Sequence, residues 1–145
     1  MTDMPNVVGV WRLRSCYVEK VQTGERLEPY GANPKGIIIL HPEGRMMALI
    51  TPSEQRPPTT DADKAEALQK LLAYSGIYRL EPPNRFVTQV DIAWFQPWVG
   101  TEQGRNFSLK GDILEIVSDP VRSPHDDASP LIGVLSWIRE SAPHS

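Results

Sequence analysis

The sequence predicts an all-β protein of one domain (residues 1–145), an eight-stranded antiparallel up-and-down β-barrel with one short helix after the third strand. Two observations support this prediction. About eight strand-like segments follow one another along the 145 residues, with one helical pattern among them. The 14 prolines fall almost entirely between these segments, which suits turns because proline cannot donate a hydrogen bond inside a sheet. Eight consecutive antiparallel strands can close into a barrel that leaves no exposed edge.

The predicted strands lie between turn-forming residues. They are, in order, Gly9–Glu19, Gly36–His41, Arg45–Thr51, Ala73–Glu81, Arg85–Trp94, Thr101–Lys110, Ile113–Ser118 and Leu131–Glu140. Pro42-Glu43-Gly44 and Pro82-Pro83-Asn84 are turn sequences of the kind that connect neighbouring antiparallel strands. The only helix is predicted over Thr59–Leu72, where Thr60 and Asp63 match a capping box.

The first predicted strand has two distinct faces. Arg12 and Arg14 mark its solvent side, because successive side chains point to opposite sides of a strand. Trp11 and Tyr17 lie on the other side and are expected to point inward, Tyr17 as part of a ligand-binding wall. Cys16 falls on the outward side, with no histidine predicted nearby to activate it.

Two later strands place polar side chains on the predicted inner wall. Arg79 marks the outer face of the fourth strand, so Tyr74 and Tyr78 are expected to point inward. In the sixth strand the solvated residues occupy one face, and Gln103 and Arg105 share the opposite, buried face. Buried polar groups of this kind require hydrogen-bond partners or a ligand. We therefore predict that all four inward side chains bind a ligand, with Arg105 as its charged anchor.

The partner of Arg105 depends on the direction of Asp91. If the fifth and sixth strands form a hairpin, Asp91 can lie opposite Arg105 on the inner face, and the pair becomes the candidate catalytic site. In the alternative, which the sequence slightly favours, Gln89 and Asp91 face water and the more apolar set faces the core. That apolar set is Val90, Ile92 and Trp94.

An apolar group completes the predicted site. Met46, Trp94 and Trp98 are expected to form a pliable pocket wall near the barrel mouth, where methionine and tryptophan suit a flat hydrophobic ligand. Core filling is the alternative for these residues. The loop Pro29–Pro34 around Tyr30 is expected to border the cavity mouth.

The histidines give weaker signals. His41 is expected to be a turn residue beside Pro42. His125 stands next to Asp126 and Asp127 in a loose loop, but this spacing matches no recognised metal site, and His144 is terminal. We therefore predict no metal site, and the absence of a Gly-x-Gly phosphate loop predicts no nucleotide cofactor.

Composition excludes several other classes of protein. The net charge of −3 and the dispersed basic residues argue against a nucleic-acid surface. No apolar run approaches the roughly 18 residues that would span a bilayer, so membrane insertion is not expected. The single cysteine, Cys16, and the absence of a visible secretory signal indicate a cytoplasmic setting.

Five segments resemble the small bacterial and fungal lipocalin-like domain family. They are Gly9-Val10-Trp11-Arg12-Leu13, Tyr30-Gly31-Ala32-Asn33-Pro34-Lys35-Gly36, Pro42-Glu43-Gly44-Arg45-Met46, Ala73-Tyr74-Ser75-Gly76-Ile77-Tyr78 and Trp98-Val99-Gly100-Thr101-Glu102-Gln103. The resemblance implies an up-and-down barrel around a small-molecule cavity. It also implies that an arginine of the last strand, here Arg139, packs over Trp11 and seals the closed end.

Three functions remain open at this point. The first is binding of a small, largely apolar, oxygenated molecule in the barrel cavity. The second is a cofactor-free isomerase, cyclase or dehydratase acting on such a molecule, with Asp91 as general acid or base and Arg105 stabilising an oxyanion. The third is a protein-interaction module, for which the sequence shows no apolar surface patch. A homodimer through the outer barrel face is compatible with the sequence, although no residue specifies it.

Overall fold

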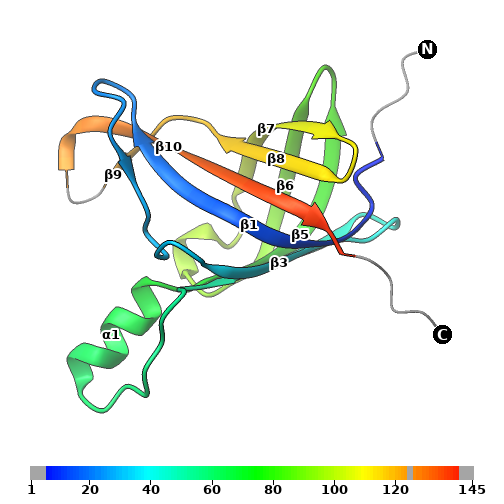
Figure 1. The fold of residues 1–145 in the computed structure, drawn as a ribbon. Helices are drawn as coiled ribbons and strands as arrows, with labels where there is room; N and C mark the ends of the chain where they lie inside the picture. Colours follow the sequence, from blue (N-terminus) through cyan, green and yellow to red (C-terminus); the bar gives the residue numbers. More distant parts are fainter. Residues whose placement is uncertain (1–5, 124–125, 141–145) are drawn as a thin grey trace.

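The computed structural model describes residues 6–123 and 126–140 and has the predicted all-β architecture (Figure 1). The barrel strands are β1 (Gly9–Lys20), β3 (Lys35–Leu40), β4 (Arg45–Thr51), β5 (Leu72–Glu81), β6 (Arg85–Ala93), β7 (Glu102–Lys110), β8 (Ile113–Ser118) and β10 (Asp126–Arg139). Two short strands, β2 (Arg26–Leu27) and β9 (Val121–Ser123), pair with β1 and β10. Each barrel strand is antiparallel to its neighbours, and pairing of β1 with β10 closes the eight-stranded barrel.

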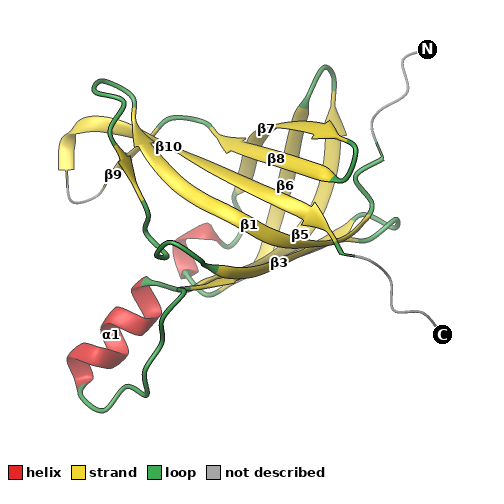
Figure 2. Cartoon of the chain, in the orientation of Figure 1, coloured by secondary structure: helices red, strands yellow, loops and turns green. Residues whose placement is uncertain are grey.

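One α-helix, α1 (Asp61–Gln69), lies between β4 and β5, and a short 3-10 helix, η1 (Gln96–Trp98), lies between β6 and β7 (Figure 2). The predicted capping box is present: the Thr60 hydroxyl accepts from the Asp63 backbone N–H at 3.0 Å, and the Asp63 carboxylate accepts from the Thr60 N–H at 3.2 Å. The helix projects away from the barrel and buries none of its residues. No helix in the described ranges is long and apolar enough to cross a membrane.

A β-bulge at Arg14 reverses the predicted faces in the second half of β1. Leu13 pairs with Trp137 and Ser15 with Ser136, which leaves Arg14 as an extra residue. One extra residue exchanges the two sides of a strand beyond it. The predicted inward position of Tyr17 and outward position of Cys16 are therefore wrong: Cys16 is buried and Tyr17 lies on the outer face.

A second β-bulge, at Asp91, turns Ile92 out of the core, whereas Asp91 itself faces out by ordinary alternation with buried Val90. On β5, Ser75 and Gly76 are adjacent, yet they pair with Ile92 and Val90, so Asp91 is the extra residue of β6. Val90 is buried, whereas Asp91 and Ile92 are both exposed. The inward pair of Asp91 with Arg105 is therefore wrong. Gln89 and Asp91 face water, as in the alternative, but Ile92, which that alternative placed in the core, is exposed.

The core fills the end of the barrel where β1 begins and β10 ends. Trp11 and Trp137 are fully buried there, and the Trp11 indole N–H donates to the Val7 carbonyl at 2.9 Å. The Arg139 guanidinium lies 4.2 Å from the centre of the Trp11 ring, as the family resemblance implies. Gly9 allows this approach, because a Cβ at that position would lie 2.8 Å from Arg139 Nη1. This end of the barrel is closed.

Candidate binding cavity

The opposite half of the barrel contains a cavity of about 400 Å³. Its lining comes from nearly every barrel strand and from the loop before β3: Cys16, Val18, Pro29, Tyr30, Ile38, Ala48, Ile50, Leu72, Tyr74, Phe86, Arg105, Ile116, Ser118, Leu131, Gly133, Leu135 and Trp137. Most of these side chains are apolar. The volume is in the range of pockets that hold small ligands.

Arg105 is the charged group in the described part of this wall, as predicted. Its Nη1 donates to the Gly104 carbonyl at 2.9 Å and its Nη2 donates to Gln103 Oε1 at 3.3 Å. A carboxylate near it, that of Asp119, is held by two hydrogen bonds of 2.7 and 2.6 Å from Arg85. Within the described residues, Arg105 therefore has neutral hydrogen-bond acceptors and no ion-pair partner within 4.0 Å.

Aromatic side chains stand beside Arg105. Tyr74 lines the cavity and packs edge-on against Trp98 of η1, with 5.1 Å between ring centres. Trp98 lies 6.0 Å from the Arg105 guanidinium and contacts Trp94 edge-on at 5.2 Å. Neither tryptophan lines the cavity as predicted. Trp98 packs instead against the lining residue Tyr74, and Trp94 packs against Trp98. Burial raises the pKa of Tyr74, so its hydroxyl stays protonated at neutral pH.

Tyr30 and Cys16 form a second polar area on the wall. Tyr30 borders the cavity, as expected for the loop between Pro29 and Pro34. Burial and the neighbouring Cys16 raise the pKa of Tyr30 to about 12, and burial raises the pKa of the Cys16 thiol to about 11. Both groups are therefore neutral at pH 7 and act as weak hydrogen-bonding groups rather than as bases or nucleophiles.

Sequence reasoning missed three polar wall residues: Cys16, Ser118 and Trp137. Ser118 Oγ accepts a hydrogen bond of 2.7 Å from the Gly133 N–H. The buried indole N–H of Trp137 has no hydrogen-bond partner among the described residues. The alternation of side chains along β10 could have identified Trp137, because it lies on the same face of that strand as Arg139. Cys16 could not be found in this way, because the bulge in β1 changes the side on which it lies.

Six of the eight predicted ligand-binding residues do not line the cavity: Trp94 and Trp98, described above, and Tyr17, Tyr78, Met46 and Gln103. Tyr17 is on the outer surface under the Arg26 guanidinium, 4.3 Å from its ring centre. Tyr78 donates its hydroxyl to the His41 carbonyl at 2.9 Å. Met46 is a fully buried core residue, which is its alternative role. Gln103 lies behind the wall, where it accepts from Arg105 and donates to the Thr101 hydroxyl at 2.8 Å.

The predicted catalytic carboxylate belongs to a surface ion pair. Asp91 accepts hydrogen bonds of 2.8 and 2.9 Å from Arg45 Nη1, which also donates to the Ser75 hydroxyl at 3.2 Å. The hydrogen bond from Arg45 lowers the pKa of Asp91. Asp91 is thus ionised at neutral pH and outside the cavity, so it has no access to a molecule bound there.

The prediction that His41 is a turn residue is confirmed. His41 Nδ1 accepts from the Glu43 N–H at 3.1 Å, which is the contact of a turn residue. His125 and His144 lie outside the described residues. Within those ranges, no group of three His, Cys, Asp or Glu side chains is arranged to hold a metal ion.

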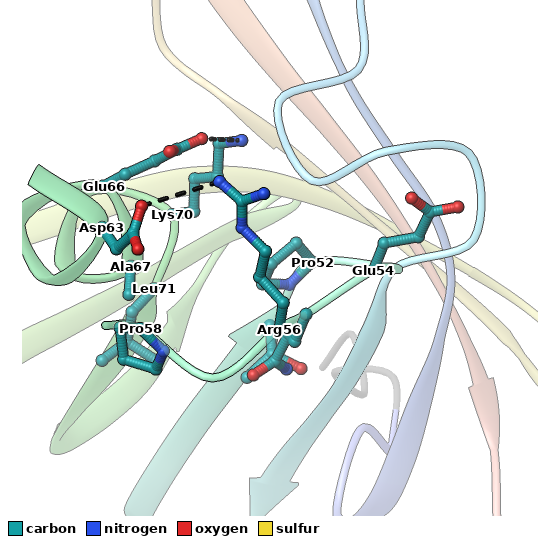
Figure 3. Close-up of a pocket in the computed structure, with 11 residues that line it drawn as sticks. Pro52, Glu54, Arg56, Pro58, Asp63, Glu66, Ala67, Lys70 and Leu71 are labelled. Carbon is teal, nitrogen blue, oxygen red and sulfur yellow. Dashed lines mark ion pairs between the residues drawn. The ribbon is translucent and has the colours of Figure 1, made fainter. Parts of the chain in front are cut away.

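A larger hollow of about 640 Å³ lies outside the barrel, between α1 and the segment from Thr51 to Pro58 (Figure 3). Its walls carry two ion pairs, Arg56–Asp63 at 3.6 Å and Lys70–Glu66 at 2.7 Å. These pairs engage four of the charged side chains of this exposed surface with one another. None of the predicted site residues borders this hollow, so the barrel cavity is the stronger candidate site.

Comparison with known proteins identifies the class. The chain matches the lipocalin-like domain family over residues 8–140 and therefore belongs to it. A lipocalin-like barrel suits small-molecule binding. A curated relative, the 4'-hydroxy-3'-methoxypropiophenone carrier protein ppsC of Aspergillus oryzae (strain ATCC 42149 / RIB 40), is 34% identical over 64 residues. That match covers 39% of this chain and 58% of the relative, which is less than two thirds of the relative's length.

Proposed function

We propose that the protein binds a small, mostly apolar, oxygenated molecule in the barrel cavity, with Arg105 holding the polar end. The observation that carries the proposal is a guanidinium on a mostly apolar wall, without an ion-pair partner among the described residues. A half-buried cation of this kind gains stability from a ligand oxygen that accepts its remaining N–H groups.

The geometry favours a ligand with one aromatic ring and a carbonyl, phenol or carboxylate oxygen. The cavity offers apolar contacts from Ile50, Phe86 and Ile116 for the ring, and Arg105 and Tyr74 supply donors for oxygen atoms. The relative supports the same class, because its name describes a carrier of a phenolic aryl ketone. We propose the ligand of this chain to be of that chemical kind.

The enzymatic alternative lacks a proton acceptor in the described part of the cavity. Asp91 lies outside, and the described lining contains no carboxylate, histidine or lysine. The raised pKa values of Cys16 and Tyr30 leave both side chains protonated at pH 7. A catalytic cycle that moves a proton therefore has less support than binding and release of an unchanged molecule.

Calorimetric titration with 4'-hydroxy-3'-methoxypropiophenone as the probe tests the proposal. Arg105→Met is expected to weaken binding about 10- to 100-fold, because a hydrogen bond to a charged group contributes about 1.5–3 kcal/mol. Arg79→Met is the matched control, since Arg79 forms exposed ion pairs with Glu81 and Glu102 on the outer surface. Equal affinity in wild type and Arg105→Met would refute the anchor.

A second readout asks whether the probe is consumed. Incubation of the probe with wild-type protein, followed by chromatography, is expected to return it unchanged. Appearance of an isomer or a dehydrated product would favour the enzymatic alternative instead.

A further inference from the structure

The outer surface of the barrel is unusually apolar over β3, β4, β5 and β6. Five large side chains on this surface are exposed: Ile39 (39%), Met47 (50%), Leu49 (41%), Ile77 (50%) and Ile92 (66%). We call this set the apolar outer face. The sequence showed no such patch, and the structure corrects that expectation.

The strand register brings these residues together on one outer surface, which the Arg45–Asp91 ion pair crosses beside Ser75. Ile39 pairs with Met47, Met47 with Ser75, and Ser75 with Ile92, so a single row crosses all four strands. Leu49 follows Met47 on the same side of β4, and Ile77 follows Ser75 on the same side of β5. Neighbouring side chains on one face of a sheet lie within contact distance of one another.

The apolar character follows from the sequences of β3 and β4. Residues 37–40 read Ile-Ile-Ile-Leu and residues 46–50 read Met-Met-Ala-Leu-Ile, which are apolar on both sides of the strand. An antiparallel sheet with one solvated side normally alternates apolar and polar residues. β7 does so, with Glu102, Asn106 and Ser108 on its exposed side. A strand that is apolar on both faces is typical of a sheet covered on both sides.

We propose that the apolar outer face is the contact surface of a homodimer, with a second copy of this chain as the occupant. The five side chains together expose roughly 500 Å², which is at the upper end of the ~300–600 Å² found for the largest patch of a monomer. Two copies then remove roughly 1,000 Å² of apolar surface, the lower bound for a specific protein interface.

The charged residues at this face suit a second copy of the chain better than they suit a strongly charged partner. Arg45 on β4 and Asp91 on β6 neutralise each other at 2.8 Å across β5, so this ion pair lies within the apolar outer face, between Ser75 and Ile77. Because this pair is neutral within each copy, two copies can meet at this face under a two-fold axis without net charge repulsion. Docking on an anionic membrane or on a strongly acidic protein would require an excess of basic groups, and Asp91 offsets the nearest one.

Light scattering coupled to size-exclusion chromatography tests the dimer at about 1–100 μM protein. Wild type is expected at twice the chain mass of 16.3 kDa, and Met47→Glu at the mass of one chain. Leu68→Glu is the matched control, because Leu68 is equally exposed (56%) but lies on α1, away from the face. This control is expected to remain dimeric.

A second variant separates loss of association from loss of folding. The double substitution Ile39→Thr and Met47→Thr keeps residues that favour strands and is expected to retain the wild-type circular dichroism spectrum while running as a monomer. A wild-type protein that is monomeric at 100 μM overturns the proposal, as does a dimer that survives both Met47→Glu and the double substitution.

Discussion

Two arginines occupy opposite ends of the barrel and differ in the groups that accept hydrogen bonds from their guanidinium N–H donors. At the closed end, Arg139 donates to the Val8 carbonyl at 2.7 Å and to the Asn6 carbonyl at 3.2 Å, and it covers the Trp11 ring. It also forms an ion pair with Asp112 at 3.4 Å. On the cavity wall, Arg105 contacts neighbours on its own strand and has no carboxylate within ion-pair distance among the described residues.

The difference separates a structural arginine from one available to a ligand. Arg139 joins the first and last strands, so its removal affects the closure of the barrel. Among the described residues, the hydrogen bonds of the Arg105 side chain stay on its own strand, so its removal is expected to affect what the cavity can hold. The predictions below test this separation.

The largest effect is expected at the closed end, on stability. Trp11→Ala removes a fully buried side chain and the hydrogen bond to Val7. The free energy of unfolding is expected to fall by about 3–5 kcal/mol, as for other buried aromatic residues replaced by alanine. Urea denaturation measures this change. A loss below about 1 kcal/mol would mean that this end is not the packed core of the barrel.

Arg139→Met is expected to reduce the free energy of unfolding by about 1–2 kcal/mol, because it removes hydrogen bonds and the stacking over Trp11 while part of the side chain is solvent-exposed. The affinity for the probe is expected to remain that of wild type. Arg105→Met should give the opposite pattern, with near wild-type stability and weakened binding. If both variants lose stability equally, the two arginines do not differ as described.

The buried thiol predicts a pH dependence of stability. Cys16 has a pKa of about 11 in the folded protein against 9.0 for an ordinary thiol. Below pH 9 the thiol is protonated in both states. Between pH 9 and 11 the unfolded chain releases its proton first, so the free energy of unfolding falls as pH rises.

Comparison with Cys16→Ser isolates this contribution. Wild type is expected to lose about 1–2 kcal/mol more than Cys16→Ser over that pH range, measured by urea denaturation at several pH values. Tyr30, whose pKa is about 12, contributes a further decline above pH 10 in both proteins. Parallel pH profiles for the two proteins would show that Cys16 is not buried in the fold.

The smallest effect is expected at Asp91. Asp91→Asn breaks an exposed ion pair with Arg45, and such pairs contribute little to stability. Probe affinity, measured by the same calorimetric titration, is expected to be unchanged. A loss of binding in Asp91→Asn would require this carboxylate to reach the cavity.

The barrel and the position of Arg105 could be predicted from the sequence because both depend on regular alternation. Solvated residues on one side of β7 place Arg105 on the other, and no irregularity interrupts its pairing with β6 or β8. The capping box of α1 was equally predictable, since Thr60 and Asp63 are three residues apart and interact locally.

The β-bulges could not be predicted, and they account for the main errors. A bulge shifts all later side chains of a strand, yet neither Arg14 nor Asp91 carries a sequence signature for one. The bulge in β1 exchanged the predicted sides of Tyr17 and Cys16, and the bulge in β6 moved Ile92 from the predicted core to the outer surface. The apolar outer face was concealed for another reason: a continuous apolar run does not reveal which of its residues face solvent.

A crystal structure of the complex with 4'-hydroxy-3'-methoxypropiophenone tests the central claim most directly. The account predicts the aromatic ring inside the barrel cavity, with a ligand oxygen about 2.7–3.2 Å from a guanidinium nitrogen of Arg105. A molecule bound in the hollow beside α1, or one inside the barrel with its oxygen atoms turned away from Arg105, would contradict it.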